Sequence, residues 1–494
     1  MERFATMSHR RKCWTLYAMV ALPLLVWWLA YFPGLISPDS VGYTVQALRE
    51  RFTADYSVTY TAFLWVSLKV TGGMALLILV QVLALAGGLT YAGTGVRQLG
   101  ARWRWIAVAV CGLAVSPMVG AFGSYLSKDV AFVIAQLFAL GALARVVASR
   151  TVTRTSGVTM FTAFLFMCLF RNNGAPMVLL AAGLAAIGLR RIGVRVLVAA
   201  GAAIAMWAVL SFAIFPAAGV HRARSSLVLG TTYADVAFAY QRFPTTFTAS
   251  DLALMSSVSP LSHWKNSTNC YTSDQLDQSH AWDLTESEKR SSQLFHLWLQ
   301  VLRRTPQAVV DARICRGAIA WMVFPPHSKT TSLVPTPFPD STYFGHAAEL
   351  GASGRDALRA RPVLRAVTHV ATFFEKITLS RNFEFVLWRG ATWAWIAYAV
   401  ATVTVRRRRW RCGEALAVVS LIVGNQVVVL LNNPNQLARY MYGCVLMGVL
   451  LLPLLSVRGH RSSQLAEEMP HERRNLAPAT DALEPSLHGP DDAT

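Results

Sequence analysis

Charged and amide side chains interrupt the apolar sequence at four short stretches. Each stretch adjoins a long apolar run, so its side chains would lie near the surface of a membrane that the runs cross. An ionisable group at that depth is costly to keep from water, and such groups are by default candidates for function. The candidates are Asp39 in SPDS, Lys128 and Asp129 in SKDV, Arg171, Asn172 and Asn173 in RNNG, and Asn433 and Arg439 in NNPNQLARY.

These residue types suit a transfer reaction on a lipid-phosphate donor. The carboxylate of Asp39 is a candidate general base that takes the proton from an acceptor hydroxyl as it attacks an anomeric carbon, with inversion if no covalent intermediate forms. Lys128, Arg171 and Arg439 are candidates for holding the phosphate leaving group. Asp129 is a candidate to bind a divalent metal or to orient Lys128. The candidate supporting groups or further metal ligands are the amides Asn172, Asn173 and Asn433.

Each stretch also has a purely structural interpretation. Asp39 is in a position to cap the helix that begins beside it, and Lys128 with Asp129 would also suit a pair at the membrane surface, the lysine reaching toward the headgroups. The asparagine-rich stretches suit turns for conformational reasons alone. However, the alternation of apolar runs places all four stretches on one side of the membrane, whereas independent structural features would be scattered over both sides. We therefore favour a shared site.

Composition places the chain among membrane proteins. Of its 494 residues, 54% are hydrophobic and only 15% are charged, which predicts an all-α polytopic membrane protein. The net charge of +20 is interpreted as topology, because the lysines and arginines cluster in short segments between the apolar runs, as the positive-inside rule requires of cytoplasmic loops. A nucleic-acid partner is not expected. The runs predict about ten transmembrane helices with both termini in the cytoplasm, at residues 14–32, 74–91, 105–118, 130–147, 158–170, 176–189, 196–215, 390–405, 415–431 and 440–455.

The apolar runs divide the chain into four parts. Residues 1–215 form an N-terminal transmembrane module whose first outer loop, 33–73, holds two helices lying along the membrane surface. Residues 216–381 form an extracytoplasmic region with a partly inserted helix near 310–324, and its aromatic residues predict that it folds around its own core. The parts that follow are a C-terminal transmembrane module at 382–457 and a disordered cytoplasmic tail at 458–494.

The predicted topology sorts the seven cysteines. Only Cys270 and Cys315 fall on the outer side, where an oxidising compartment would let them pair. The alternative is two unpaired buried thiols.

Taken together, the motifs resemble the GT-C superfamily of polyprenyl-phosphate-dependent membrane glycosyltransferases. The resemblance rests on a first span that ends in PG, then SPDS, the KD pair, RNNG and the late LARYMY, in that order. It implies a GT-C-like bundle in the cell membrane, surrounded by membrane lipid, with a polyprenyl-phosphate sugar as donor and an envelope glycan, lipid or protein as acceptor. It also implies that Asp39 is the catalytic base or a metal-assisted acid/base residue, with Mg or Mn as the candidate metal, and that Lys128, Arg171 or Arg439 contacts the lipid phosphate.

The chain departs from the family's pattern in one place. Related sequences often carry a His-Pro pair after the first-loop helix, where this chain reads DYSVTYTAF, so Asp55 and Tyr56 are candidate substitutes. The rival functions are a lipid or polysaccharide transporter or flippase, which would require ionisable or broken-helix sites near mid-membrane, and a non-catalytic scaffold for envelope assembly. The one-sided polar groups and the large outer region favour the glycosyltransferase.

Overall fold

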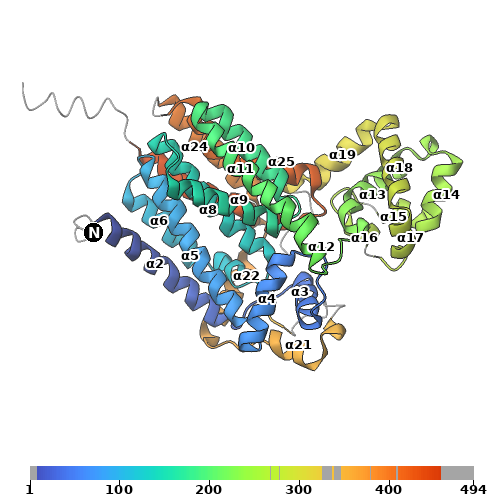
Figure 1. Ribbon diagram of the computed structural model, residues 1–494, viewed down its shortest axis with the longest axis horizontal. Coiled ribbons are helices and arrows are strands. Elements are labelled where there is room, and N and C mark those ends of the chain that lie inside the picture. The colour runs from blue at the N-terminus through green and yellow to red at the C-terminus, as the bar shows by residue number, and fades with distance from the viewer. Residues whose placement is uncertain are drawn as a thin grey trace, which may run out of the picture.

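The computed structural model describes residues 8–267, 269–277, 279–324, 336–338, 347–378, 380–407 and 410–457. Within these ranges all regular secondary structure is helical and there is no strand, as the sequence predicts. The helices form a long bundle with a smaller lobe beside one end of it (Figure 1). The predicted disordered tail, 458–494, lies outside the described residues.

The bundle is built from apolar helices that bury their small and branched side chains in one continuous core. α5 packs along α8, α8 along α9, and α10 along both α11 and α25. The helices of the bundle are α2 (His9–Ala30), α5 (Ala75–Gln98), α6 (Trp103–Val115), α8 (Lys128–Ser149), α9 (Arg154–Phe170), α10 (Gly174–Leu189), α11 (Arg191–Val209), α24 (Gly390–Arg406), α25 (Cys412–Asn432) and α26 (Tyr442–Leu451).

Several of these helices are suited to cross a membrane. In the described part of the chain, five are long and apolar enough, or six if the bent pair of α6 and α7 (Pro117–Gly123) counts as one span. The five are α2, α5, α8, α25, and α11 with its continuation through η1 (Leu210–Ile214) and α12 (Phe215–Ala217). α9, α10 and the run from α26 through η5 (Leu452–Ser456) are apolar but shorter. A multi-pass membrane protein therefore fits, while the predicted count of about ten crossings is not confirmed, although each predicted crossing falls on a bundle helix.

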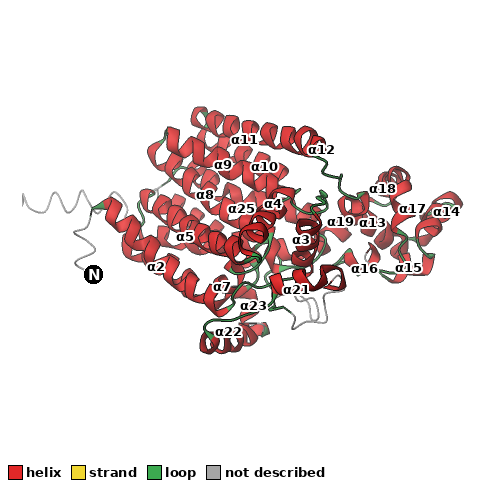
Figure 2. Cartoon of the chain, turned by 60° about the horizontal axis from the view of Figure 1, so that its bottom comes forward, coloured by secondary structure: helices red, strands yellow, loops and turns green. Residues whose placement is uncertain are grey.

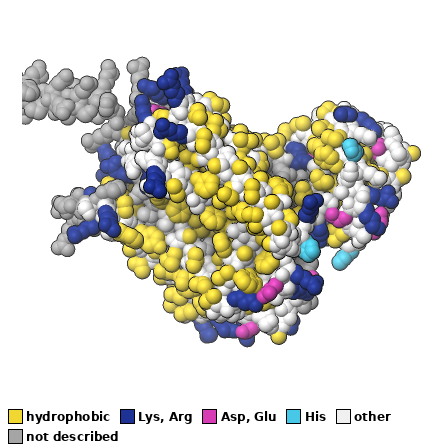
Figure 3. Space-filling view, viewed as in Figure 1, with side chains coloured by type: hydrophobic (Ala, Val, Ile, Leu, Met, Phe, Trp, Pro, Cys, Tyr) yellow, Lys and Arg dark blue, Asp and Glu magenta, His cyan; other side chains and the backbone are white. Residues whose placement is uncertain are grey.

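Basic side chains gather at the end of the bundle away from the lobe. Arg97 lies in the last turn of α5, Arg102 precedes α6, Arg150 follows α8 and Arg191 begins α11. Figure 3 shows this end in dark blue at the left and upper left of the bundle, with apolar side chains covering the surface between. The helix ends that carry the candidate site residues lie at the opposite end.

The lobe folds around its own aromatic core, as the sequence predicts for this region. Tyr233, Trp264 and Trp282 are buried there and their rings contact one another. The helices of the lobe are α13 (Ser225–Arg242), η2 (Pro244–Thr246), α14 (Ala249–Val258), α15 (Leu261–Asn266), α16 (Asp274–Asp277), α17 (Leu284–Lys289), α18 (Ser291–Arg304) and α19 (Pro306–Arg316).

The stretch 310–324 does not form the single helix that we predicted. α19 ends at Arg316, and after Gly317 a short helix, α20 (Ala318–Trp321), packs against α24 and α25. A side chain at Gly317 would place its Cβ 2.7 Å from the Cα of Leu430, so only glycine allows α25 to approach the backbone this closely. The break is where the lobe joins the bundle.

Short helices cover the end of the bundle next to the lobe (Figure 2). α3 and α4 are the two helices that the sequence predicts in loop 33–73, and they pack on each other, with α4 also contacting α5 and α9. The helices at this end are α3 (Pro38–Arg49), α4 (Val58–Thr71), η3 (Ala347–Leu350), α21 (Gly351–Leu358), α22 (Arg365–Thr378), α23 (Arg381–Leu387) and η4 (Ala438–Tyr440).

Candidate functional site

The loop after α2 is fastened to the segment before α8. The backbone NH of Leu35 donates to Ser124 O at 2.8 Å, and the carbonyl of Leu35 accepts from the NH of Leu126 at 2.8 Å. Ser40 Oγ donates to Leu126 O at 2.7 Å. These bonds bring the first turn of α3 next to the first turn of α8, so that Asp39 lies near the SKDV motif.

Asp39 forms an ion pair with a residue four hundred positions away. Its Oδ2 accepts from Arg439 Nη1 at 2.6 Å, and its side chain is 30% exposed. Asp39 is not the cap of α3, since that position belongs to Ser37. The structural interpretation of Asp39 as a cap is therefore wrong, and the carboxylate is directed at a cation.

Asp129 lies deeper in the same group. Its side chain is only 2% exposed, and Oδ1 accepts from Arg171 Nη1 at 2.8 Å. Oδ2 lies 3.4 Å from Arg439 Nε. Charges of alternating sign therefore run from Asp39 through Arg439 and Asp129 to Arg171. The carboxylate of Asp129 pairs with the two arginines rather than with Lys128.

Lys128 is the unneutralised cation of the group. Its side chain is half-buried, and within the described parts of the chain its ammonium group makes no hydrogen bond or ion pair. Lys128, Arg171 and Arg439 carry three positive charges against the two negative charges of Asp39 and Asp129, which leaves a surplus of one. A partly buried site with one unpaired positive charge is suited to bind an anion.

Tyrosines complete the walls of the site. Arg439 Nη1 donates to the hydroxyl of Tyr125 at 3.1 Å, and the guanidinium of Arg171 lies 4.8 Å from the ring centroid of Tyr440. Tyr43 is fully buried beside the charged group, and its hydroxyl has no hydrogen-bond partner in the described ranges. Sequence reasoning missed these residues because nothing in the sequence distinguishes them from the other aromatic residues near helix ends.

The cations keep Asp39 ionised. Burial by itself raises the pKa of this carboxyl, but the attraction of Arg439 and Lys128 outweighs burial and holds the pKa below its usual value of 3.8. At neutral pH Asp39 is therefore a carboxylate that can accept a proton, although its basicity is limited while Arg439 remains paired with it.

The three predicted asparagines divide between two places. Asn173 Oδ1 accepts from Arg171 Nε at 3.1 Å and so belongs to the site, while Asn172 is exposed next to it. Asn433 is buried and donates to the carbonyl of Arg316 at 2.7 Å. Our prediction that Asn433 supports the site is not reflected in the geometry, because its turn is held against α19 instead.

The contact between Asn433 and Arg316 is part of a second buried charge cluster. Asp235 of α13 accepts from both Arg313 and Arg316 of α19, and Asp235 is fully buried. This cluster joins α13, α19 and the end of α25, so it positions the lobe against the bundle. Its two arginines and one carboxylate also leave one positive charge in excess, but the Arg316 side chain is only 1% exposed and lies out of reach of a ligand.

Asp274 brings a carboxyl group from the lobe to the edge of the site, and sequence reasoning missed it. Asn435 donates a hydrogen bond to Asp274, and the NH of Ser273 donates to Pro434 O at 2.7 Å. Burial raises the pKa of Asp274, partly offset by the bond from Asn435 and the charge of Arg439. Burial and the charge of Asp274 raise the pKa of Asp277 to about 7.

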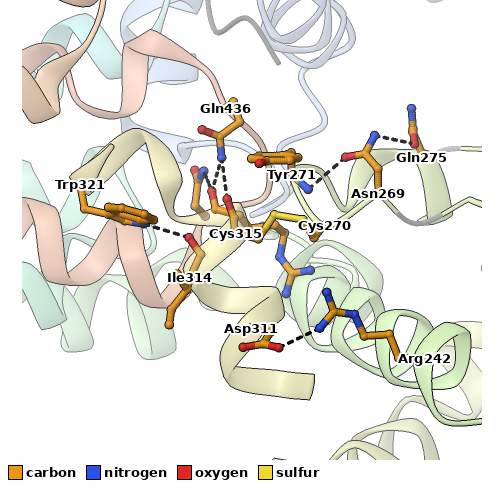
Figure 4. Close-up of a disulfide and its surroundings, with 12 residues drawn as sticks. Arg242, Asn269, Cys270, Tyr271, Gln275, Asp311, Ile314, Cys315, Trp321 and Gln436 are labelled. Carbon is orange, nitrogen blue, oxygen red and sulfur yellow. Dashed lines mark hydrogen bonds and ion pairs between the residues drawn. A yellow bond between two sulfur atoms is a disulfide. The ribbon is translucent and has the colours of Figure 1, made fainter. Parts of the chain in front are cut away.

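Cys270 and Cys315 form a disulfide, with their Cα atoms 5.5 Å apart (Figure 4). The bridge links the loop before α16 to the last turn of α19. Gln436 donates to the carbonyl of Cys315 at 3.3 Å, so the bridge also adjoins the turn that leads to Arg439. The alternative of two free thiols does not apply.

The predicted metal does not fit the donor set. In the described part of the chain no three His, Cys, Asp or Glu residues gather in a way that could hold a metal ion. The carboxylates of Asp39 and Asp129 are each engaged by an arginine, and the surplus charge of the site is positive. A divalent cation would have to displace both arginines, so no step is assigned to one.

An apolar cavity of about 440 Å³ opens beside the site. It lies between α4, α5, α8 and α9, and it reaches from Val158 to Phe170, the residue before Arg171. The twelve helical steps from Val158 to Phe170, at a rise of 1.5 Å each, make this about 18 Å. The only polar side chains among those lining it are Tyr60, Gln81, Thr159 and Thr162.

Asp55 and Tyr56, the candidate substitutes for a His-Pro pair, contact Arg224 and Tyr43 rather than the charged side chains of the site. Asp55 Oδ1 accepts from the backbone NH of Arg224 at 2.8 Å and Oδ2 from its Nε at 2.9 Å. The ring of Tyr56 packs edge-on against Tyr43 at 5.0 Å between centroids. Asp55 therefore fastens the first loop to the start of the lobe, while Tyr56 packs within that loop against Tyr43, a residue of the site wall.

Comparison with known proteins adds no relative, since no family model, no curated protein and no solved structure matches this chain.

Proposed function

We propose that this chain is an integral-membrane glycosyltransferase, which moves a sugar from a polyprenyl-phosphate donor to a cell-envelope acceptor at the outer face of the membrane. The observation that supports it best is the meeting of Asp39 with Lys128, Arg171 and Arg439, together with an apolar cavity whose lining residue Phe170 directly precedes Arg171. These residues come from distant parts of the chain, and their convergence is the arrangement that the transfer requires.

The donor would bind with its tail in the cavity and its phosphate among the cations. Phe170 lines the cavity and the next residue, Arg171, belongs to the charged group, so a lipid chain leaving the phosphate enters the cavity directly. The surplus of one positive charge among Lys128, Arg171, Arg439, Asp39 and Asp129, counted without Asp274 at the edge of the site, matches the single negative charge of a sugar phosphodiester. A diphosphate, with at least twice that charge, would be left uncompensated.

Binding of the donor phosphate would free the proposed general base, Asp39, from its ion pair with Arg439. Arg439 holds Asp39 in the unliganded site, and a donor phosphate competes for the same guanidinium. Once Arg439 turns to the phosphate, the pKa of Asp39 rises toward its usual value and the carboxylate becomes a better proton acceptor. Donor binding and activation of Asp39 are therefore coupled.

The transfer is a single displacement. The acceptor hydroxyl oxygen forms a bond to the anomeric carbon while the bond from that carbon to the phosphate oxygen breaks, and the hydroxyl proton passes to Asp39. Lys128, Arg171 and Arg439 stabilise the charge that grows on the departing polyprenyl phosphate. The anomeric configuration is inverted because no enzyme-bound sugar forms.

Release of polyprenyl phosphate is the measurement that tests this proposal. Purified protein in nanodiscs receives polyprenyl-phosphate sugars and an envelope acceptor extract, and Asp39→Asn is expected to abolish release while leaving expression unchanged. Asp55→Asn is the matched control, since Asp55 is also a carboxylate paired with an arginine but lies outside the site. Unchanged turnover in Asp39→Asn would remove the catalytic assignment, and donor binding without release by the native protein would favour a transporter or scaffold.

A further inference from the structure

α22 exposes an apolar face that no part of the described chain covers. Val370, Phe373, Phe374 and Ile377 are 50%, 61%, 45% and 38% exposed. At 100° per residue these four positions fall within one sector of the helix. Single exposed apolar residues are common on proteins, but four on one helix face, two of them phenylalanine, mark an interaction surface.

The neighbouring side of α22, about 100° around the helix from Val370, holds it against the bundle. Ala371 is fully buried in a small cluster with Trp27 and Tyr31, and Thr368 Oγ1 donates to Ala30 O at 2.6 Å. The backbone NH of Val363 donates to Leu29 O at 2.9 Å. α22 is therefore anchored where α2 ends, beside α7 and α23 (Figure 2).

That position identifies what covers the exposed face. α2 is one of the helices suited to cross a membrane, and its outward side chains, such as Leu22 at 63% and Val26 at 40% exposed, belong to the surface that lipid would cover. A helix fastened to residues 29–32 lies at the end of that span, which is the boundary between the acyl chains and the headgroups. The exposed apolar face of α22 therefore lies next to the end of a helix that also exposes apolar side chains.

The polar edge of α22 suits the same boundary. Arg365, His369 and Lys376 are exposed and fall within one sector beside the apolar face, on the side away from Ala371. Basic side chains flanking an apolar face are typical of helices that lie in the membrane surface, where they contact headgroup phosphates.

We infer that α22 is an interfacial helix, which inserts the Phe373 and Phe374 face into the lipid and places Arg365 and Lys376 at the headgroup phosphates. It sets the depth of this end of the bundle in the membrane. This inference does not depend on the proposed enzymatic function, because it rests only on the anchoring of α22 to the end of α2.

A photo-crosslinking amino acid tests this placement in the full-length protein. Benzoylphenylalanine replaces Phe373 or Phe374 in protein reconstituted in nanodiscs of phosphatidylcholine and phosphatidylglycerol, and irradiation is followed by mass spectrometry. We expect lipid adducts at both positions, as at Leu22 of α2, and their loss when the same amino acid replaces Thr372 on the polar side. The aromatic replacement of an exposed phenylalanine is not expected to disturb folding, which the unchanged adduct at Leu22 in a doubly labelled protein would verify.

Two outcomes would overturn the inference. Adducts to a second copy of the chain or to another protein would show that the face is a protein interface. No adduct at Phe373 and Phe374, with the adduct at Leu22 retained, would show that the face lies in water.

Discussion

Replacing the buried carboxylate of Asp129 should destabilise the fold far more than replacing Asp39. Asp129 is 2% exposed and is shared by Arg171 at 2.8 Å and Arg439 at 3.4 Å. Asp129→Asn keeps the size of the side chain and removes its charge, so Arg171 loses the carboxylate that neutralises it and Arg439 is left with Asp39 alone. Asp39 is 30% exposed and pairs with Arg439 alone, and water can replace part of what Asp39→Asn removes.

The magnitudes follow from burial. Breaking a buried ion pair by removing one partner costs about 3–5 kcal/mol, because the other charge stays buried. A charge-assisted hydrogen bond that water partly screens contributes about 1–2 kcal/mol. We therefore expect Asp129→Asn to lower the free energy of unfolding by about 2 kcal/mol more than Asp39→Asn does.

Buried thiols provide the assay. Cys168 is 2% and Cys444 is 0% exposed, so a maleimide dye that fluoresces on reaction with thiols reports when the bundle opens on heating. The unfolding midpoint should fall in the order native, Asp39→Asn, Asp129→Asn. Asp356→Asn is the control, since its pair with Arg361 is on the surface with Asp356 65% exposed, and it should behave as the native protein.

The reasoning would be refuted by equal midpoints for Asp39→Asn and Asp129→Asn. It would also be refuted if Asp129→Asn matched the Asp356→Asn control, because a carboxylate buried between two arginines cannot be lost at no cost.

Three further outcomes follow from the site and the lobe. Because Asp39 has a lowered pKa, its pair with Arg439 stabilises the fold above about pH 4, and that stability is lost as the pH falls through the lowered pKa. The plot of kcat/KM against pH should therefore show no loss of activity from protonation of Asp39 between pH 7 and 5. A loss in that range would contradict the pairing. Tyr43→Phe should leave the unfolding midpoint unchanged or raise it, since the hydroxyl has no partner in the described ranges. If this hydroxyl bonds the donor, the donor affinity measured by titration falls about fivefold, or about 1 kcal/mol. An unchanged affinity would exclude the hydroxyl from the binding site. Replacing Cys270 and Cys315 by Ala should destabilise the lobe by about 4 kcal/mol, which is the loop-closure entropy expected for a sequence separation of 45. Limited proteolysis measures this change. Alkylation of both thiols in the native protein without reductant would show that the bridge is absent.

Local patterns predicted the helices well. The apolar runs and the basic clusters that separate them specify where bundle helices begin and end, and α3 and α4 lie where loop 33–73 predicted them. The helix near 310–324 was predicted wrongly as one element, because it breaks at Gly317, where the backbone of Leu430 leaves no room for a side chain. A contact between positions so far apart leaves no local pattern in the sequence.

By itself, the sequence determined that this is an all-helical chain with apolar helices suited to a membrane, and that its unusual polar residues gather at one end, because hydrophobicity and helix ends are local properties. Only the tertiary structure decided which charged side chains pair with one another. It pairs Asp39 with Arg439 and Asp129 with Arg171, gives Lys128 no ion pair within the described ranges, and bonds Asn433 to the carbonyl of Arg316. Charge alone allows any carboxylate to pair with any cation, so the choice depends on which helix ends packing brings within a few ångströms.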